Sequence, residues 1–182
     1  MTFKAESEKS QLRLNIGGTL PRAGWKILNI QPGKDVDYTG DCSDLGQFRD
    51  GSVCEVYASH VFEHLSYVRE LPHALKEVHR ILENGGIFRC SVPDFEMLCK
   101  MFLHPSLTAD QRFYLMNVVF GGQQDAYDFH KVGLTWEFLS SYLQQAGFST
   151  IRRVDEFRLF ENDCSSIRIG GQLISLNIEA IK

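Results

Sequence analysis

Short stretches in which apolar and polar residues alternate recur along the chain, and they predict β-strands. The first of them, residues 12–16, runs directly into Gly17 and Gly18. A second stretch at residues 25–30 follows after only a few residues, so little chain is left between the first two strands. Further strands are predicted at residues 35–41, 53–58, 87–92, 149–154 and 174–180.

Four other segments are predicted to be helices. In residues 71–82 apolar side chains recur at i, i+4, i+7 and i+11 on one face, and two glycines follow as a stop signal. Two more helices are predicted at residues 94–103 and 110–119, and Thr135 is expected to cap a fourth that ends at Gly147. This order of strands and helices indicates an α/β fold, an open and mostly parallel sheet covered by helices.

Length and composition restrict the class of protein. With 182 residues, 43% of them hydrophobic, we expect one domain spanning residues 1–182, with residues 1–10 as a flexible N-terminal tail. The formal net charge of -4 offers no general attraction to nucleic acid or to anionic membranes. No apolar stretch predicts a signal segment or a membrane span. The five cysteines are scattered without a Cys-x-x-Cys pair, which favours a reducing, cytoplasmic compartment.

The loops that follow the strands are the candidate sites, because open parallel sheets bind ligands outside the carboxyl ends of their strands. Gly17 and Gly18 after the first strand let a ligand approach the backbone, although an ordinary tight turn explains them equally well. Asn29 ends the second strand, where nucleotide-binding domains commonly place an acidic residue on a ribose. Asp41 can accept a hydrogen bond from an exocyclic amine or form an Asx turn.

The densest polar cluster of the sequence follows the fourth strand. His60, Glu63 and His64 spell His-x-x-Glu-His, which resembles the signature of the inverzincin metalloproteases. That signature requires both histidines on one helix and a third ligand, whereas His60 directly follows a strand. We therefore expect no metal ion, and a zinc hydrolase is the weaker interpretation. A neutral histidine or a carboxylate here would instead orient a substrate or take its proton.

Two later loops add candidate residues. Asp94 follows the strand at residues 87–92 and is either a helix N-cap or a site residue. Residues 121–131 combine aromatic, acidic, histidine and lysine side chains without periodicity, and they include Asp128 and His130. Polar aromatic loops of this length are often functional, so this one is interpreted either as a lid over a site or as a surface loop.

Taken in order, these loops resemble those of the class I S-adenosylmethionine (SAM)-dependent methyltransferases, and more narrowly a small bacterial group of that family. The resemblance covers nearly the whole chain from Leu12 onward. It rests on residues 14–18, 57–64, 79–86 and 91–94, and it continues through residues 121–123, 128–130, 146–148 and 175–180.

The resemblance implies a Rossmann-like sheet of seven strands with an antiparallel last strand, helices on both faces and an abbreviated first crossover. It also implies SAM as the cofactor, held by residues of the first four loops. These are Asn15, Gly17 and Gly18 at the methionine part, Asn29 at the ribose, Asp41 with Cys42 at the adenine, and Ser59 with His60 beside the sulfonium.

Candidate catalytic groups follow from loop position. Methyl transfer needs little covalent help, since alignment and removal of the acceptor's proton supply most of the catalysis. The candidate bases are His60, His64 and His130, and Asp94 and Asp128 are candidate orienting carboxylates.

Three features depart from the family pattern. Thr19 replaces a glycine of the usual Gly-x-Gly loop, Asn29 replaces an acid, and the first crossover is too short for a helix. The first two changes would each weaken SAM binding by about 1 kcal/mol. The leading hypothesis is a SAM-dependent methyltransferase acting on O or N of a small-molecule or glycan-like acceptor. The alternatives are a catalytically degenerate methyltransferase-fold binding or assembly protein and a nucleotide-sugar or NAD-type Rossmann enzyme. A homodimer is compatible with each.

Overall fold

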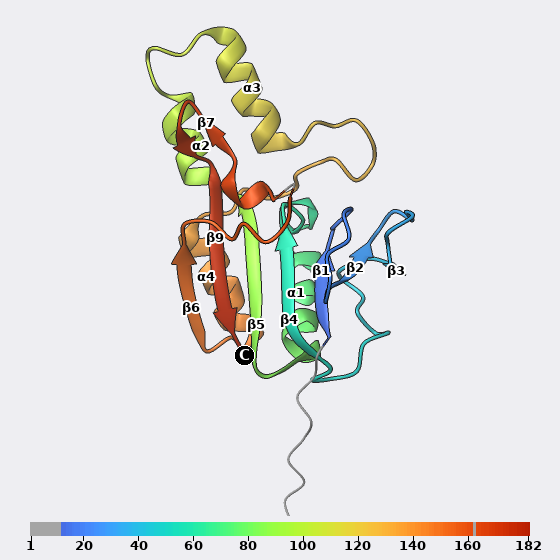
Figure 1. Cartoon of the computed structure of the whole chain (residues 1–182). Coiled ribbons are helices and arrows are strands. Elements are labelled where there is room, and N and C mark those ends of the chain that lie inside the picture. The colour runs from blue at the N-terminus through green and yellow to red at the C-terminus, as the bar shows by residue number, and fades with distance from the viewer. Residues whose placement is uncertain (1–11, 162) are drawn as a thin grey trace, which may run out of the picture.

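Seven strands form one sheet in the order β3-β2-β1-β4-β5-β9-β6 in the computed structural model, which describes residues 12–161 and 163–182 (Figure 1). Six strands run in one direction, and β9 is antiparallel to both of its neighbours, β5 and β6. The strands are β1 (Arg13–Ile16), β2 (Lys26–Asn29), β3 (Tyr38–Thr39), β4 (Val53–Ser59), β5 (Leu82–Pro93), β6 (Thr150–Val154) and β9 (Ser175–Ile181). The predicted seven-stranded α/β fold with its antiparallel last strand is therefore confirmed. Residues 1–10, predicted as a tail, lie outside the described residues.

Four helices were predicted, and all four form. They are α1 (Glu70–Ile81), α2 (Phe95–Phe102), α3 (Ala109–Phe120) and α4 (Trp136–Ala146). Thr135 caps α4 by accepting a hydrogen bond from the Phe138 amide, and Gly147 ends that helix in the left-handed conformation, as expected. Among the described residues, no helix combines the length and the apolar character that a membrane span needs.

The helices cover the sheet unevenly. α1 and α4 lie side by side behind the sheet, where their apolar side chains share one core with the strands (Figure 1). α2 and α3 extend beyond the carboxyl end of β5 and pack around a small separate cluster of Leu98, Leu115 and Ile174. The front face carries no α-helix in the described part of the chain, so the expectation of helices on both faces is corrected. The cause is the short first crossover, because residues 17–25 connect β1 to β2 without a helix.

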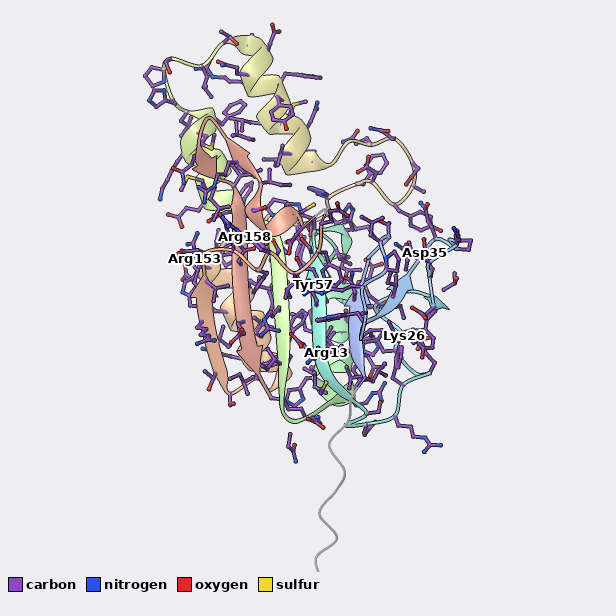
Figure 2. All side chains as sticks on the ribbon, in the orientation of Figure 1. Arg13, Lys26, Asp35, Tyr57, Arg153 and Arg158 are labelled. Carbon is purple, nitrogen blue, oxygen red and sulfur yellow. The ribbon has the colours of Figure 1, made fainter. Side chains whose placement is uncertain are left out.

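Charged side chains occupy the front face in place of a helix layer. Arg13, Glu55, Arg89, Glu179 and Arg152 come from five neighbouring strands and alternate in sign across the sheet. Figure 2 labels Arg13 at the start of this row. The Arg13 Nε to Glu55 Oε2 distance is 3.2 Å and the Arg89 Nε to Glu179 Oε2 distance is 3.1 Å. Glu55 also pairs with Arg89, and Glu179 with Arg152. Arg13 and Arg152 at the two ends of this row are well exposed, whereas Glu55 and Glu179 are largely buried between the arginines that neutralise them, so the row covers this part of the face without a helix.

The segment after β6 covers the carboxyl half of this front face. Its Phe157 and Phe160 rings pack on Tyr57 with centroid distances of 5.6 and 5.1 Å, and Phe160 also meets Trp25. The Tyr57 hydroxyl donates a hydrogen bond to Asp163 in the same segment. The segment continues into a short 3-10 turn, η2 (Cys164–Ser166), and the hairpin of β7 (Arg168–Ile169) and β8 (Gln172–Leu173). It therefore replaces part of the missing layer and closes the end of the sheet where the loops converge.

Candidate functional site

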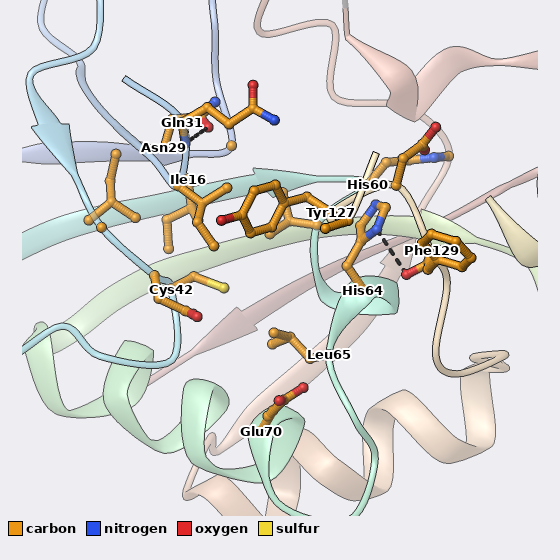
Figure 3. A pocket seen from close by; sticks show the side chains of 18 of the residues that line it. Ile16, Asn29, Gln31, Cys42, His60, His64, Leu65, Glu70, Tyr127 and Phe129 are labelled. Atoms are coloured by element: carbon orange, nitrogen blue, oxygen red, sulfur yellow. Dashed lines mark hydrogen bonds between the residues drawn. The ribbon is translucent and has the colours of Figure 1, made fainter. Parts of the chain in front are cut away.

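The main cavity lies at the carboxyl ends of β1, β2, β3 and β4, where the loops after these parallel strands converge (Figure 3). Its volume is about 520 Å³, within the range of about 300–1,000 Å³ typical of small-molecule and cofactor sites. Its lining residues include Ile16, Gly17, Leu28, Asn29, Asp41, Cys42, His60, Val61, His64, Tyr127 and Asp128. The topology thus brings six of the predicted site residues to the wall of one cavity, together with Asp128 from the predicted lid.

The turn after β1 can be made only by glycine. Gly17 has φ of 78°, and a Cβ there would lie 2.4 Å from Cγ2 of Val61. A Cβ on Gly18 would lie 2.2 Å from Nδ2 of Asn15. The Gly17 amide donates to the Leu28 carbonyl at 2.8 Å, which fixes the turn to the end of β2. The tight turn and the close approach of the backbone to the cavity are therefore both present.

Asn29 ties this turn to the second strand. Its Nδ2 donates to the Gly18 carbonyl at 3.0 Å, and its Oδ1 accepts from the Gln31 amide at 2.9 Å. An aspartate could accept from Gln31 but could not donate to Gly18, because an ionised carboxylate only accepts. The amide that replaces the family's usual acid thus has a structural role at the cavity wall.

Asp41 and Cys42 line the cavity at the end of β3. Asp41 Oδ1 accepts from the Ser43 amide at 2.7 Å, so the predicted Asx turn is present. Burial raises the pKa of the Cys42 thiol to about 12, with the Asp41 charge adding to the effect. Cys42 therefore contributes a neutral apolar surface, next to the carboxylate of Asp41.

His60 sits at the junction of β4 and the 3-10 turn η1 (Phe62–His64), with a positive φ of 54° that is unusual for a non-glycine residue. Its Nε2 lies 3.1 Å from Oγ of Ser175, and that hydroxyl donates to the Cys164 carbonyl at 2.7 Å. The single hydroxyl hydrogen of Ser175 is used in the bond to Cys164, so Ser175 Oγ can only accept from His60. His60 Nε2 therefore carries the ring hydrogen, and Nδ1 keeps a lone pair. Burial, with smaller contributions from His130 and His64, lowers the pKa of His60 to about 4. His60 is therefore neutral near pH 7.

Glu63 is 1% exposed, and neither of its carboxyl oxygens has a hydrogen-bond partner among residues 12–161 and 163–182. Burial raises the pKa of this carboxyl to about 8. Its Oε1 lies 3.5 Å from His60 Nδ1 and 3.9 Å from His130 Nε2. Glu63 was noted only within the His-x-x-Glu-His pattern and was not among the predicted site residues. The density of polar residues after β4 was the signal that could have found it.

His64 and His130 meet beside Glu63. Their rings are 4.6 Å apart in an edge-to-face arrangement, although 66 positions separate them in the chain. His64 Nδ1 lies 3.2 Å from the Phe129 carbonyl, which can only accept, so His64 donates from Nδ1 and keeps a lone pair on Nε2 (Figure 3). Burial lowers the pKa of both histidines. His64 lines the main cavity, and His130 lies just behind it.

Residues 125–129 of the predicted lid lie against the cavity. The Tyr127 ring projects between Ile16 and His64 in Figure 3, and Gln31 Nε2 donates to Asp125 Oδ2 at 3.4 Å across the opening. Asp128 shapes the loop, because its carboxylate accepts from the amides of Gly122 and Gln124. The interpretation as a lid is therefore favoured over a plain surface loop, and Asp128 holds the loop closed on itself.

Four predicted site residues lie elsewhere. Asp94 does not line the cavity: it caps α2 by accepting from the Met97 amide and pairs with Arg153 at 2.7 Å, so the N-cap interpretation is the correct one. Asn15, Gly18 and Ser59 line a smaller cavity of about 190 Å³ on the other side of the glycine turn. The segment after β6 closes that cavity with Phe160, Asp163 and Cys164, none of which was predicted as a site residue.

Comparisons with known proteins agree with this architecture. Residues 24–90 match a family model described as a methyltransferase domain, while no curated protein matches the chain. A SAM-dependent methyltransferase from Archaeoglobus fulgidus has 17% identity and a TM-score of 0.60, with 95% of this chain and 86% of that chain covered. One from Thermotoga maritima has 18% identity and a TM-score of 0.55, with 93% and 81% covered.

A third similar structure was solved with a bound ligand. It is the methyltransferase CalH in complex with S-adenosylhomocysteine (SAH), with 19% identity, a TM-score of 0.54, and 95% of this chain and 51% of that chain covered. At such low identity, these structures show a shared fold. Together with the match over residues 24–90, they confirm the resemblance to the class I SAM-dependent methyltransferases.

Proposed function

We propose that this protein binds SAM in the main cavity and transfers its methyl group to an oxygen or nitrogen of a small-molecule or glycan-like acceptor. The observation that carries the proposal is the division of one cavity into two unlike walls. One wall holds the glycine turn, Asn29 and Asp41, and the other holds two neutral histidines beside a lid. A cofactor on the first wall would face an acceptor on the second.

The residues of the first wall suit SAM. Leu28, Cys42 and Leu65 offer apolar surface for an adenine ring, and Asp41 offers a carboxylate oxygen to its amine. Asn29 lines the cavity at the end of β2 and would hold the ribose. Bound SAM would supply a methyl group already activated by a sulfonium. A neutral His60 near that positive charge avoids the repulsion that a protonated imidazole would cause.

The second wall suits an acceptor that must lose a proton. His60 Nδ1 and His64 Nε2 each keep a lone pair, and each opposite nitrogen is held by a hydrogen bond that fixes the ring. A base oriented in this way can accept a proton from a hydroxyl or an amine. The lid, with Tyr127 over the opening, would exclude water from the reacting groups. The cytoplasmic location stays a prediction from the cysteine pattern.

A second candidate function is that of a degenerate binding or assembly protein. It is favoured by the glycine turn, in which the space beside both glycines is filled by Val61 and Asn15, and by Asn29, whose amide is already bonded at both ends. A ligand would have to compete with these internal contacts.

Calorimetric titration with SAH separates the two candidates. We expect micromolar binding to the full chain, and Asp41→Asn should weaken it several-fold, because a neutral acceptor forms a weaker bond than a charged one. The matched control Asp35→Asn changes an exposed acid that does not line the cavity and should leave the affinity unchanged. If millimolar SAH produces no heat, the degenerate function replaces the enzyme. If SAH binds, transfer of labelled methyl from SAM to a panel of hydroxyl and amine acceptors tests the acceptor class.

A further inference from the structure

The buried carboxyl of Glu63 has no polar partner that would justify its position. A carboxyl group removed from water and left without hydrogen bonds destabilises the folded state, and native structures rarely keep one without a function. Here both oxygens of Glu63 are in that situation. The main chain of the same residue is firmly held, because its carbonyl accepts from the amides of Lys131 at 2.8 Å and Val132 at 3.3 Å. The backbone of Glu63 is therefore fixed, and its carboxyl oxygen Oε1 lies 3.5 Å from His60 Nδ1 and 3.9 Å from His130 Nε2.

The nitrogen atoms around this carboxyl are those that metal ions bind. One nitrogen of His64, one of His130 and one oxygen of Glu63 all lie within 4.8 Å of one another. His64 donates its Nδ1 hydrogen to the Phe129 carbonyl. Histidines that bind metals typically donate a hydrogen bond from one ring N–H to a carbonyl or carboxylate in this way. This bond fixes the ring and leaves the other nitrogen free to bind the ion.

We propose that Glu63, His64 and His130 form a binding site for a divalent transition-metal ion of the zinc type. Two imidazoles and one carboxylate suit zinc and its first-row neighbours, whereas magnesium and calcium prefer oxygen ligands. Bonds of about 2.0–2.2 Å require the three ligand atoms to move closer by roughly 1 Å. We expect binding of the ion to draw these side chains together, since η1 and the end of the lid already bring them within 4.8 Å of one another.

This ligand set differs from the one that the sequence pattern suggested. The His-x-x-Glu-His signature would use His60 and His64 on one helix, and we expected no metal because His60 follows a strand. The structure agrees that these two histidines do not share a helix. It supplies instead a histidine from a distant loop, His130, on the same side of Glu63 as His64. The expectation of no metal rested on the local pattern alone and could not include this residue.

Three protein ligands leave a fourth position open, as in catalytic rather than structural zinc sites. His64 lines the main cavity, so that position would be reached from the cavity. Resting on the proposed function, the ion would hold an acceptor oxygen or nitrogen there and His60 would remain as the base. The binding of the ion itself does not depend on SAM.

Cobalt is the probe for the test, because Co²⁺ enters zinc sites and its visible absorption reports the geometry of its ligands. The full chain, stripped with a chelator, is titrated with Co²⁺ and then with Zn²⁺. We expect one Co²⁺ per chain, visible bands of a four- or five-coordinate ion, and displacement by Zn²⁺. Sulfur-to-cobalt bands in the near ultraviolet should be absent, since no cysteine belongs to the ligand set.

Variants locate the ion. Glu63→Gln keeps the shape of the side chain and His130→Gln removes a ligand nitrogen, and each should weaken Co²⁺ binding more than tenfold. His104→Gln is the matched control, because His104 is exposed and its imidazole contacts the Ser106 hydroxyl, away from the proposed ligand set. Circular dichroism of the metal-free variants checks that each is folded. If Glu63→Gln is unfolded, the Co²⁺ affinity of a folded His130→Gln variant tests the site instead.

Two results would overturn the proposal. One is a folded wild-type chain that shows no cobalt bands at micromolar Co²⁺. The other is a folded Glu63→Gln variant that binds as tightly as wild type, which would make Glu63 a buried neutral acid. SAH titration of the same samples keeps the two proposals apart. Metal binding without SAH binding would refute the proposed function only, and SAH binding without metal binding would refute this site only.

Discussion

Two groups of residues lie on opposite sides of the main cavity, some lining it and some directly behind its lining, and they use their polar atoms in opposite ways. On the glycine side, comprising Gly17, Gly18 and Asn29, the main-chain and side-chain groups that face one another are bonded to each other. On the histidine side, comprising His60, Glu63, His64 and His130, a buried carboxyl has no hydrogen bond within the described residues, and its Oε1 lies 3.5 Å from His60 Nδ1 and 3.9 Å from His130 Nε2. The glycine side is complete without a ligand, and the histidine side is not.

We expect this difference to appear as a difference in energetics: the glycine side stabilises the fold by itself, whereas the histidine side destabilises the fold when no ligand is bound. Leaving one buried polar group unsatisfied costs about 1–3 kcal/mol, and such costs persist where function requires them. On the glycine side the hydrogen bonds are already made within the protein, so the question is whether a ligand can bind without breaking them. Substitutions on one side at a time therefore show whether stability or ligand affinity responds.

The largest effect is expected at Gly17. Gly17→Ala places a Cβ at 2.4 Å from Val61 in a left-handed conformation. Strain and overlap together should lower the free energy of unfolding by about 2–5 kcal/mol and SAH affinity by more than tenfold. Chemical denaturation and calorimetry measure the two quantities. Gly170→Ala is the control, since Gly170 also has positive φ but a Cβ added there would have nothing within 4 Å. Equal effects at both positions would show that backbone strain alone matters.

The opposite sign is expected on the histidine side. Glu63→Met replaces an unbonded buried carboxyl with an apolar chain of similar size, so the metal-free protein should gain about 1–2 kcal/mol of stability. The same variant should lose methyl transfer, as is common when a destabilised functional group is removed. Denaturation of chelator-treated protein measures the gain. A loss of stability would mean that Glu63 makes favourable contacts in the folded state, and the contrast between the two walls would fail.

Asp94 lies outside both walls, although its position after a strand made it a candidate for the site. Asp94→Ala removes the α2 cap and should cost about 1 kcal/mol of stability, while SAH affinity stays within twofold. Asp94→Asn retains a capping oxygen and should recover most of the loss. Weaker SAH binding by a stably folded Asp94→Asn would return this residue to the site.

The elements of the fold were predictable because their signals are local. Alternation predicted the strands, and Thr135 with Gly147 predicted both ends of α4. The helices expected on both faces were wrong for a reason that the sequence contains. The alternation in residues 174–180 indicates one apolar and one polar face, and the polar side chains Asn177 and Glu179 are buried by hydrogen bonds and ion pairs instead of by a helix. The hairpin of β7 and β8 was also missed, although the adjacent Gly170 and Gly171 are typical of such a turn.

The site was only partly predictable because its contacts join distant residues. The strand ends predicted that Gly17, Asn29, Asp41 and His60 lie together, since parallel strands end at the same edge, and the structure places them around one cavity. No local pattern brings His130 beside Glu63. This contact depends on the path of the lid, residues 121–131, whose sequence has no hydrophobic periodicity from which that path could be predicted.

The smallest effect is expected at Asn29, where the two roles of the glycine side conflict. Asn29→Asp restores the acid that the family usually has, and a carboxylate should hold a ribose hydroxyl more strongly than an amide does. The same change removes the hydrogen bond to the Gly18 carbonyl, which costs about 1 kcal/mol of stability. We expect SAH affinity to rise only a few-fold while the melting temperature falls, as measured by calorimetry and thermal unfolding. Asn29→Ala loses both roles and should weaken both quantities. If Asn29→Asp leaves SAH affinity unchanged or lower, Asn29 stabilises the turn and does not bind the ribose. The hydrogen bonds of the glycine side would then serve the fold alone.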